Sequence, residues 1–506
     1  MKVLLLTTEN TLVCFGLRQV AASLREDCHE VHSLFMPKEF DGTDSSAEIK
    51  AVDALVTQLE PDLIGFSLMS SHMNRTRRLS SHLREEFPEI DVVWGGIHPT
   101  LAPEECLSYA DYVIVGEGEM SSRLLLEALE TGGDLATVAG VCYIRDGAMV
   151  RVPCASRLPD LDTLPFADFE LESQFILHEG EVHQAEPELM RYYVPGMMDA
   201  HYVLSSRGCP HSCSYCCNSA LRKVADGPYL RRRSPGHFIG EMVYIREQLP
   251  YIKGFVFMDD SFLYGENDWF ETFCSRYREH VGLPFLCWAN PTAVREEIIE
   301  QLVQVGLVGV HVGLESGSER ITRGVYNRPV SNERFLECMD ILARYKDKIV
   351  DRRVDIITDN PYETEEDTIA SIRLLATLEK PFFLGIVSLL FYPMTALTER
   401  AAADGKLPET SHIYVREFFH YQPTYLNRLM RTIPLTPGPL IELFVRLRSS
   451  KAGRLIFYLY YFGYFVAVRR QSRNLRRRLT LWVFKRFGHL FPDDFIVTTR
   501  IAMIDF

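Results

Sequence analysis

The stretch Arg207–Asn218 reads RGCPHSCSYCCN and carries three cysteines in the spacing CxxxCxxC, at Cys209, Cys213 and Cys216. It follows an apolar run, Tyr202–Ser205, that has the length of a buried strand. Three thiolates on one loop can hold three irons of a cubane iron–sulfur cluster, because sulfur is the ligand that such clusters prefer. The fourth iron then stays open to bind a substrate or a cofactor.

A zinc site and a chance grouping are the alternatives to this cluster. Zinc normally takes a second pair of ligands elsewhere in the chain, and the sequence offers no CxxC or HxxxH partner. Chance is disfavoured because the motif follows the strand that opens a regular alternation of strands and helices. The adjacent thiol, Cys217, is expected to pack beside the loop rather than to bind metal.

That alternation predicts a barrel or partial barrel between Tyr202 and Pro393, with its chemistry at the carboxyl ends of the strands. The expected strands are Tyr202–Ser205, Gly254–Met258, Phe285–Trp288, Gly309–Gly313, Arg353–Ile357 and Phe383–Leu390. The expected helices include Phe238–Gln248, Val294–Val305, Asn332–Tyr345 and Glu365–Leu378. Six such units in one run correspond to a (β/α)6 arrangement.

At the cysteine motif the chain resembles the radical S-adenosylmethionine (SAM) superfamily, and the resemblance covers about residues 202–393. It implies a [4Fe–4S] cluster on the three cysteines, with the open iron chelating the amino and carboxylate groups of S-adenosylmethionine. Reduction of the cluster would then cleave the sulfonium and give a 5′-deoxyadenosyl radical. Tyr215 matches the position on the adenine side of this cofactor.

Two further segments support the resemblance. Asp259 and Asp260 end the second strand, where the superfamily contacts the amino group of the cofactor. Glu315 and Ser316 end the fourth, where they would face the ribose or the methionine part. Polar residues that close apolar strands on this rim are expected to face a ligand. The alternative for Asp259 and Glu315 is helix capping.

The fifth and sixth strands depart from the superfamily pattern. After the fifth strand the chain reads TDNPYET (358–364), where relatives often carry glycines before the proline. The sixth carries YPMT (392–395) instead of a Pro-Gly-Thr. Asp359 and Asn360 are therefore predicted to contact a substrate specific to this branch.

Residues 1–150 predict a Rossmann-like (flavodoxin-like) domain with a parallel sheet covered on both faces. Apolar strands are expected at Val3–Leu6, Leu63–Ser67, Val92–Trp94 and Tyr112–Val115, and a hairpin at Val138–Val152. Helical patterns at Ala47–Leu59 and Arg75–Phe87 separate the strands.

This region resembles the cobalamin-binding domain that precedes many radical SAM proteins. Glycines at strand ends let the backbone approach a large planar ligand and its nucleotide tail. The alternative is a generic flavodoxin-like domain used for packing. The resemblance implies cobalamin contacts from three segments: Ser67 and Leu68; Gly95, Gly96, His98, Pro99 and Thr100; and Gly116, Glu117, Gly118 and Glu119.

Many cobalamin domains carry DxHxxG after the first strand, with the His bound beneath cobalt. The matching stretch here is TLVCFG (11–16), which keeps the glycine and lacks the Asp and the His. The sequence therefore predicts cobalamin without an axial His at that position. His72 could ligate instead, but a lone His at a helix start is more often a surface residue.

The whole chain has 506 residues and a formal charge of −14, with 24% charged and 47% hydrophobic residues. These values exclude a disordered, collagen-like or polytopic membrane protein. The N-terminal MKVLLLTTEN lacks the small residues of a cleavage site and predicts a first strand rather than a signal peptide. We therefore expect a cytoplasmic, reducing environment, in which clustered cysteines bind metal.

The stretch 446–486 holds twelve Lys or Arg and no acid, so the rest of the chain carries −26. Inside it, Leu455–Val468 (LIFYLYYFGYFVAV) is too short to span a bilayer. Such a helix could lie at an anionic surface, peripherally at the inner membrane, or pack on the barrel. The sequence does not decide between these two. Nucleic acid is not expected as a partner, because no recognition fold accompanies the charge.

Four segments result: a cobalamin domain (1–150), a linker (151–199), a radical SAM partial barrel (200–395) and a mostly helical C-terminal domain (396–506). The predicted function is a cobalamin-dependent methyltransferase that acts on an unactivated carbon of a small or lipophilic substrate. It would use methylcobalamin, a 5′-deoxyadenosyl radical and an external electron donor of flavodoxin or ferredoxin type. The alternatives are a non-methylating oxidative cyclase or rearrangement enzyme, and a non-catalytic corrinoid or electron carrier.

Overall fold

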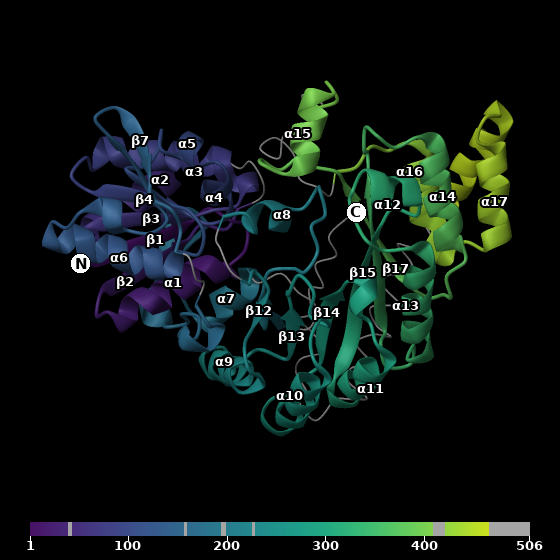
Figure 1. Ribbon diagram of the computed structural model, residues 1–506, viewed down its shortest axis with the longest axis horizontal. Coiled ribbons are helices and arrows are strands. Elements are labelled where there is room, and N and C mark those ends of the chain that lie inside the picture. The colour runs from purple at the N-terminus through teal and green to yellow at the C-terminus, as the bar shows by residue number, and fades with distance from the viewer. Residues whose placement is uncertain (39–42, 156–158, 194–198, 225–227, 408–419, 465–506) are drawn as a thin grey trace. The chain divides into compact units, whose positions relative to one another are not determined.

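The computed structural model describes residues 1–38, 43–155, 159–193, 199–224, 228–407 and 420–464. They divide into two compact units (Figure 1). Within the described residues, the first unit comprises 1–193, 205–251 and 390–407, and the second comprises 199–204, 252–389 and 420–464. The units therefore interleave along the chain, and they do not coincide with the consecutive domains that the sequence predicts.

The first unit is built on a nine-stranded sheet with the order β7-β6-β5-β4-β3-β1-β2-β8-β9. Strands β1 to β5 are parallel, and in space they follow the order 2-1-3-4-5 of a flavodoxin-like fold, as predicted. The strands are β1 (Lys2–Thr7), β2 (Glu30–Phe35), β3 (Leu63–Ser67), β4 (Asp91–Gly95), β5 (Tyr112–Ile114), β6 (Val141–Arg145), β7 (Ala148–Arg151), β8 (Gln174–His178) and β9 (Glu181–Gln184).

Two parts of this sheet differ from the sequence prediction. Strand β2 was missed, because its apolar residues are interrupted by His32 and Ser33. The segment 151–199 was predicted as a linker, yet β8 pairs parallel with β2 and β9 returns antiparallel to β8. Acidic and proline residues mark this segment as a loop in sequence, while the apolar residues of β8 allow it to extend the sheet.

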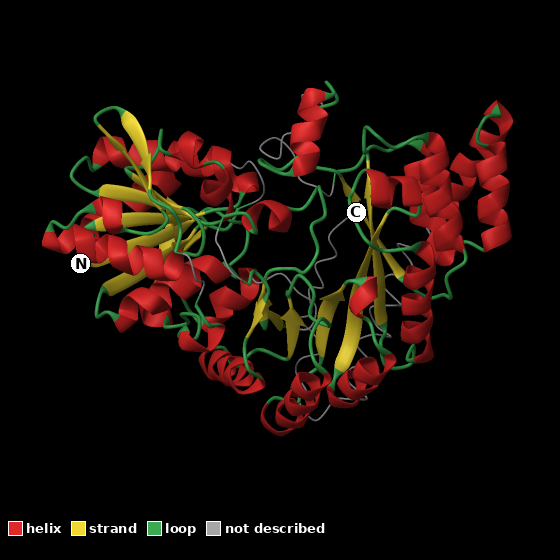
Figure 2. Cartoon of the chain, in the orientation of Figure 1, coloured by secondary structure: helices red, strands yellow, loops and turns green. Residues whose placement is uncertain are grey.

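Helices cover both faces of the sheet (Figure 2). On one face, α2 and α3 pack on Leu4, Leu6, Ile64 and Phe66 through fully buried apolar side chains. Helix α2 begins with a capping box, in which Ser45 and Glu48 each accept the other's backbone N–H. The helices are α1 (Phe15–Glu26), α2 (Ser46–Leu59), α3 (Met73–Glu86), α4 (Ile97–Leu101), α5 (Pro103–Cys106), α6 (Gly118–Thr131) and α7 (Pro187–Tyr193).

Two later stretches of chain complete the first unit. Residues 205–251 form a short antiparallel hairpin of β11 (Ser206–Arg207) and β12 (Arg231–Arg232), and the cysteine motif lies between its strands. The stretch that begins at Leu390 adds α15. The helices of these stretches are α8 (Cys217–Leu221), α9 (Pro235–Gln248) and α15 (Ala396–Ala403).

The second unit contains six parallel strands in chain order, as the alternation predicts for a partial barrel. They are β10 (Ala200–Val203), β13 (Gly254–Phe257), β14 (Phe285–Ala289), β15 (Leu307–Glu315), β16 (Asp351–Thr358) and β17 (Phe383–Ser388). The connecting helices are α10 (Asn267–His280), α11 (Glu296–Val305), α12 (Glu319–Gly324), α13 (Asn332–Arg344) and α14 (Glu365–Ala376). Phe257 stacks on Phe285 with ring centroids 4.6 Å apart, and both rings contact Phe273 of α10.

The described C-terminal residues belong to this second unit. Helices α16 (Tyr425–Thr432) and α17 (Gly438–Leu447) pack against α14, and a further helix covers 451–464. No helix in the described part of the chain is long and apolar enough to cross a membrane. Most of the basic stretch predicted at 446–486 lies outside the described residues.

Candidate cofactor site

The carboxyl ends of β1, β3, β4 and β5 meet along one edge of the first sheet, because these strands are parallel. In the 2-1-3-4-5 order, the crevice that accepts a ligand lies where β1 and β3 adjoin. Small residues line this place: a Cβ at Gly16 would lie only 3.8 Å from the Ser67 hydroxyl. The predicted cobalamin residues Ser67, Gly95 and Gly96 are all partly accessible at this edge.

The loops after β3 and β4 are locked together at Gly96. The Leu68 N–H donates to Gly95 O at 3.1 Å, and the His98 N–H donates to Leu68 O at 3.3 Å. Gly96 has φ 105°, and a Cβ there would stand 2.8 Å from Leu68 O. A glycine is therefore required for the close approach of these two loops.

Several of the predicted cobalamin residues are buried, and their hydrogen bonds join the loops at this edge. His98 is fully buried, its Nδ1 lies 3.0 Å from the Ser70 hydroxyl, and burial lowers its pKa to about 4. Thr100 donates to Gly96 O at 2.8 Å and accepts from the Gly116 N–H at 3.0 Å, so it joins the loops after β4 and β5. Leu68 and Pro99 are buried as well.

After β1, the position of the absent His is taken by Val13, which is buried. Beside it lie the Cys14 thiol and the Glu9 carboxyl, 3.8 Å apart, and burial raises the pKa of Glu9 to about 7. His72 was expected at the surface, but it is 93% buried, since it exposes only 7% of its area. Burial and the charge of Arg75 lower the His72 pKa to about 4.

The cysteine loop is held by short-range contacts. The Cys216 N–H donates to Cys213 O at 3.1 Å, and the Arg222 guanidinium donates to Cys209 O. Gly208 has φ 87°, and a Cβ there would stand 2.5 Å from Tyr229 O. The predicted adenine-side residue Tyr215 is half-buried within this loop.

The donor set of this loop fits an iron–sulfur cluster. Cys209, Cys213 and Cys216 are not joined in disulfide bonds. Among the described residues, no three His, Cys, Asp or Glu side chains converge on one point that could hold a single metal ion. A cubane does not need such a point, because each thiolate binds a different iron. The zinc alternative, by contrast, needs four ligands around one ion.

The stretch beginning at Leu390 packs against this loop. The Leu397 N–H donates to Ser214 O at 2.9 Å. Burial raises the pKa of Tyr392 well above its usual range, and the nearby Cys217 and Cys216 act in the same direction. Sequence reasoning missed these contacts, because nothing in the motif indicates which distant segment covers it.

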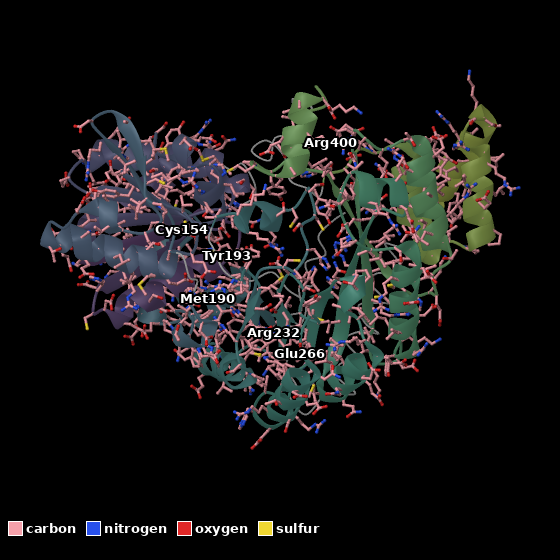
Figure 3. The ribbon with its side chains drawn as sticks, viewed as in Figure 1. Cys154, Met190, Tyr193, Arg232, Glu266 and Arg400 are labelled. Carbon is pink, nitrogen blue, oxygen red and sulfur yellow. The ribbon has the colours of Figure 1, made fainter. Side chains whose placement is uncertain are left out.

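Glu117 and Glu119, predicted to contact cobalamin, form ion pairs. Arg207 contacts Glu117 at 3.1 Å and Glu119 at 2.5 Å, and Arg231 also contacts Glu117. Burial raises the pKa of Glu119, but Arg207 outweighs burial and holds it below its usual value. Cys154, labelled in Figure 3, lies close to Gly116 and donates to Val115 O at 3.2 Å.

The remaining predicted cofactor residues lie in the second unit, at the carboxyl ends of their strands. Asp259 is buried, whereas Asp260 is exposed. Glu315 has φ 67° and lies over Gly313, where a Cβ would meet its Oε1 at 2.3 Å. Neither Asp259 nor Glu315 caps a described helix, since α10 begins after Glu266 and α12 after Ser318.

Ser316 is fully buried and takes part in a polar network at the end of its strand. Its hydroxyl donates to Glu363 at 3.4 Å and accepts from the Ser318 N–H at 3.2 Å. Burial and the charge of Asp367 raise the pKa of Glu363 to about 8. Sequence reasoning missed Glu363, although it stands in the departing segment TDNPYET.

Asp359, predicted to contact substrate, is engaged by the C-terminal part of its own unit. Its carboxylate accepts from the Ser388 hydroxyl at 2.8 Å, the Gln422 N–H at 2.8 Å and the Asn427 amide at 3.2 Å. The substrate role of Asp359 and Asn360 remains a prediction.

Two families match this chain. The B12 binding domain family matches residues 1–126, and the Radical SAM superfamily matches residues 203–375. Both matches agree with the resemblances found at the strand-end glycines and at the cysteine motif.

Curated relatives are similar over long stretches. An uncharacterized methyltransferase of Pyrococcus horikoshii is 23% identical over 429 residues, which cover 82% of this chain and 85% of the relative. An anaerobic magnesium-protoporphyrin IX monomethyl ester cyclase of Synechocystis is 29% identical over 233 residues, or 46% of this chain and 42% of the relative.

A solved structure shares the fold. The radical S-adenosylmethionine methyltransferase TsrM of Kitasatospora setae, solved with cobalamin and a [4Fe–4S] cluster, superposes with a TM-score of 0.63. The match covers 80% of this chain and 75% of that chain, at 17% identity. The same protein is also solved with tryptophan as substrate and an S-adenosylmethionine analogue.

Proposed function

We propose that the chain, which matches the B12 binding domain family over residues 1–126 and the Radical SAM superfamily over 203–375, is a cobalamin-dependent radical SAM methyltransferase. The observation that carries the proposal is the composition of the first unit. The loop with the three cysteines Cys209, Cys213 and Cys216, none of them in a disulfide bond, belongs to the same compact unit as the glycine-lined edge of the flavodoxin-like sheet. Cluster and cobalamin sites in one unit suit a reaction in which cobalamin would take its methyl group from S-adenosylmethionine, leaving S-adenosylhomocysteine, and the cluster would reduce a second S-adenosylmethionine.

The residues of this chain would bind and orient the groups that react. The three thiolates would hold the cluster, with Tyr215 on the adenine side of S-adenosylmethionine. Ser67, Gly95, Gly96, Gly116 and Gly118 would line the cobalamin edge, and Asp259, Asp260, Glu315 and Ser316 would contact S-adenosylmethionine. When bound, cluster and S-adenosylmethionine supply a 5′-deoxyadenosyl radical, and cobalamin supplies the methyl group.

The experiment that tests this function is anaerobic incubation of the reconstituted chain with methyl-labelled S-adenosylmethionine, a reductant and cell extract. We expect a labelled product in the mass spectrum together with S-adenosylhomocysteine and 5′-deoxyadenosine. Cys213→Ala should abolish the product and the cluster absorbance. Cys28→Ala, at an exposed thiol outside the loop, is the matched control and should change neither.

Two other functions would give different products. A non-methylating enzyme, such as an oxidative cyclase or a rearrangement enzyme, would form 5′-deoxyadenosine without methyl transfer; the similarity to the Synechocystis cyclase favours this second candidate. A corrinoid or electron carrier would not cleave S-adenosylmethionine at all.

The proposal includes a small-molecule or lipophilic substrate and an external one-electron donor of flavodoxin or ferredoxin type. The methyl group would go to an unactivated carbon, because a deoxyadenosyl radical can abstract hydrogen from such a position. A cytoplasmic location suits the thiolate ligands, which need a reducing compartment.

The proposal also includes cobalamin without an axial His at Val13. Val13 is buried and has no atom that could bind cobalt, and His72 is enclosed in protein rather than placed at the surface. Electron paramagnetic resonance of the cob(II)alamin form should therefore show no nitrogen splitting from the protein. Splitting that disappears in His72→Gln would instead identify His72 as the ligand.

Peripheral membrane contact is the last part of the proposal, and the helix 451–464 supports it. Leu455, Leu459 and Phe462 lie along one face of this helix and are 62%, 67% and 71% exposed. The opposite face packs on its own unit, since Phe457 is fully buried and the Tyr464 hydroxyl donates to Arg431 O at 3.0 Å. An exposed apolar face with basic neighbours suits an anionic lipid surface.

Sedimentation of the full chain with lipid vesicles tests this contact. We expect binding to vesicles that contain phosphatidylglycerol and much weaker binding to pure phosphatidylcholine. The double variant Leu459→Ser/Phe462→Ser should lose binding, whereas Met120→Ser, at an exposed apolar residue of the first unit, should keep it. Equal binding of wild type and double variant would contradict the contact.

A further inference from the structure

The cysteine loop starts and ends in a hairpin that places two cations side by side. Arg207 of β11 lies directly opposite Arg231 of β12 in the antiparallel register, and Ser206 lies opposite Arg232, which Figure 3 labels. Like charges opposite each other destabilise a pair of strands. Anions from outside the hairpin would relieve this repulsion.

The loop after β5 supplies those anions. Arg207 Nη1 lies 3.1 Å from Glu117 Oε2, and Arg207 Nη2 donates to Glu119 Oε1 at 2.5 Å. Arg231 contacts the other oxygen of Glu117 and also donates to Pro159 O at 2.7 Å. Two arginines and two glutamates thus cancel in charge, with at most a quarter of any of the four side chains exposed.

Contacts between the hairpin strands and the cysteine loop restrain the positions of the cysteines. Directly after Arg207, Gly208 packs against Tyr229 O, near the start of β12. The Tyr229 hydroxyl donates to Asn218 at 2.6 Å, next to Cys217 in α8. From Arg222, which follows α8, the guanidinium reaches back to Cys209 O. A continuous set of contacts therefore leads from Glu117 and Glu119 to both ends of the loop.

We propose that Glu117 and Glu119 are positioning residues that clamp the cysteine hairpin to the edge of the flavodoxin-like sheet. They would hold the cluster loop at a set place relative to the strand ends that receive cobalamin. This role differs from the cofactor contact that the sequence suggests for these two residues. The effect of the clamp on the placement of the two cofactors rests on the proposed function. The clamp itself consists of contacts within the chain and does not depend on that function.

Hydrogen–deuterium exchange of the full chain without cofactors tests the clamp. The variant Glu117→Gln/Glu119→Gln should raise amide exchange in 206–224 and 228–233 by about tenfold or more, because three charge-assisted contacts are lost: Arg207 with Glu117, Arg207 with Glu119, and Arg231 with Glu117. Glu127→Gln, at an exposed position of α6, is the matched control and should leave exchange in these segments unchanged. Unchanged exchange in the double variant would overturn the proposal.

A charge exchange separates positioning from simple loss of folding. Arg207→Glu alone places three carboxylates together, so their repulsion should raise amide exchange in the hairpin. Adding Glu119→Arg restores two cations and two anions, and should restore slow exchange. Failure of this rescue, with far-ultraviolet circular dichroism unchanged, would count against the clamp.

With cofactors bound, the double Gln variant should retain iron and cobalt but show altered spin–spin broadening between the reduced cluster and cob(II)alamin. A loss of cobalamin affinity with unchanged exchange would instead make Glu117 and Glu119 cofactor ligands, and would overturn the proposal. If the wild type binds no cobalamin or does not cleave S-adenosylmethionine, the proposed function fails while the exchange result still decides the clamp.

Discussion

At the scale of single residues, two neighbouring carboxyls in the second unit have opposite protonation. Although burial raises it, hydrogen bonds from Arg320 and Ser318 hold the pKa of Asp367 well below its usual range. Burial and the charge of Asp367 raise the pKa of Glu363 to about 8, and the charge of Arg320 opposes them only weakly. We therefore expect Glu363 to hold a proton at neutral pH and Asp367 to be ionised.

This difference predicts a pH-dependent stability that Glu363→Gln should remove. In the folded state Glu363 holds a proton that the unfolded state releases above about pH 4.5. The contribution of Glu363 to the free energy of unfolding is therefore fully present below about pH 4.5. It is lost as the pH rises through about 8. At pH 9 the variant should be more stable than the wild type by about 2–4 kcal/mol. Urea unfolding of both proteins at pH 6 and pH 9 measures this.

The matched control is Glu366→Gln, at an exposed position of the same segment. It should unfold like the wild type at both values of pH. Parallel pH profiles for Glu363→Gln and the wild type would show that Glu363 is ionised in the folded chain.

At the scale of elements, the end of β16 anchors the described C-terminal helices. Asp359 adopts φ 61°, which Asn and Asp tolerate better than most residues, and its carboxylate accepts from Ser388, Gln422 and Asn427. One residue therefore joins β16, β17 and the start of α16. This explains why the helical segment belongs to the second unit rather than to a domain of its own.

Asp359→Ala should loosen this junction. The substitution removes three accepted hydrogen bonds and puts alanine into a left-handed conformation. We therefore expect the free energy of unfolding to fall by about 2–4 kcal/mol. Amide exchange should rise in 420–432, as hydrogen–deuterium exchange would show. Asp359→Asn, which keeps an acceptor and the backbone preference, should have a smaller effect, and Asp347→Ala, at an exposed site, almost none. Unchanged exchange in Asp359→Ala would rule out the anchor.

At the scale of the whole molecule, one compact unit is assembled from stretches far apart in sequence. The cysteine loop lies between the N-terminal sheet, through Arg207, and the stretch that begins at Leu390, through Leu397. The iron–sulfur motif is therefore local in sequence, but the structure around it is not.

Leu397→Ala tests that dependence. The side chain is 1% exposed, and its truncation should destabilise the first unit by about 2–5 kcal/mol. We also expect the reconstituted chain to lose cluster absorbance faster in the presence of a chelator. Glu399→Ala, on the exposed side of α15, is the control and should retain the cluster like the wild type. Equal rates of loss would show that α15 does not protect the loop.

The sequence by itself determined the two folds, the three cysteines and the glycines at the sheet edge. These features depend on local spacing: apolar runs predict strands, CxxxCxxC brings thiolates to one loop, and strand-end glycines mark a close approach. The sequence prediction missed β2, whose apolar residues are interrupted by His32 and Ser33. It also missed the sheet strands within 151–199, because acidic and proline residues surround their short apolar segments.

Only the tertiary structure decided what the polar side chains do. Glu117 and Glu119 lie in a segment typical of cobalamin contact, and in the structure they form ion pairs with Arg207 and Arg231. His72 is buried although its local sequence is typical of a surface helix start. Ion pairs and burial depend on residues that are far apart in the chain, such as Glu117 and Arg231, which are 114 residues apart. No local sequence pattern encodes such pairs.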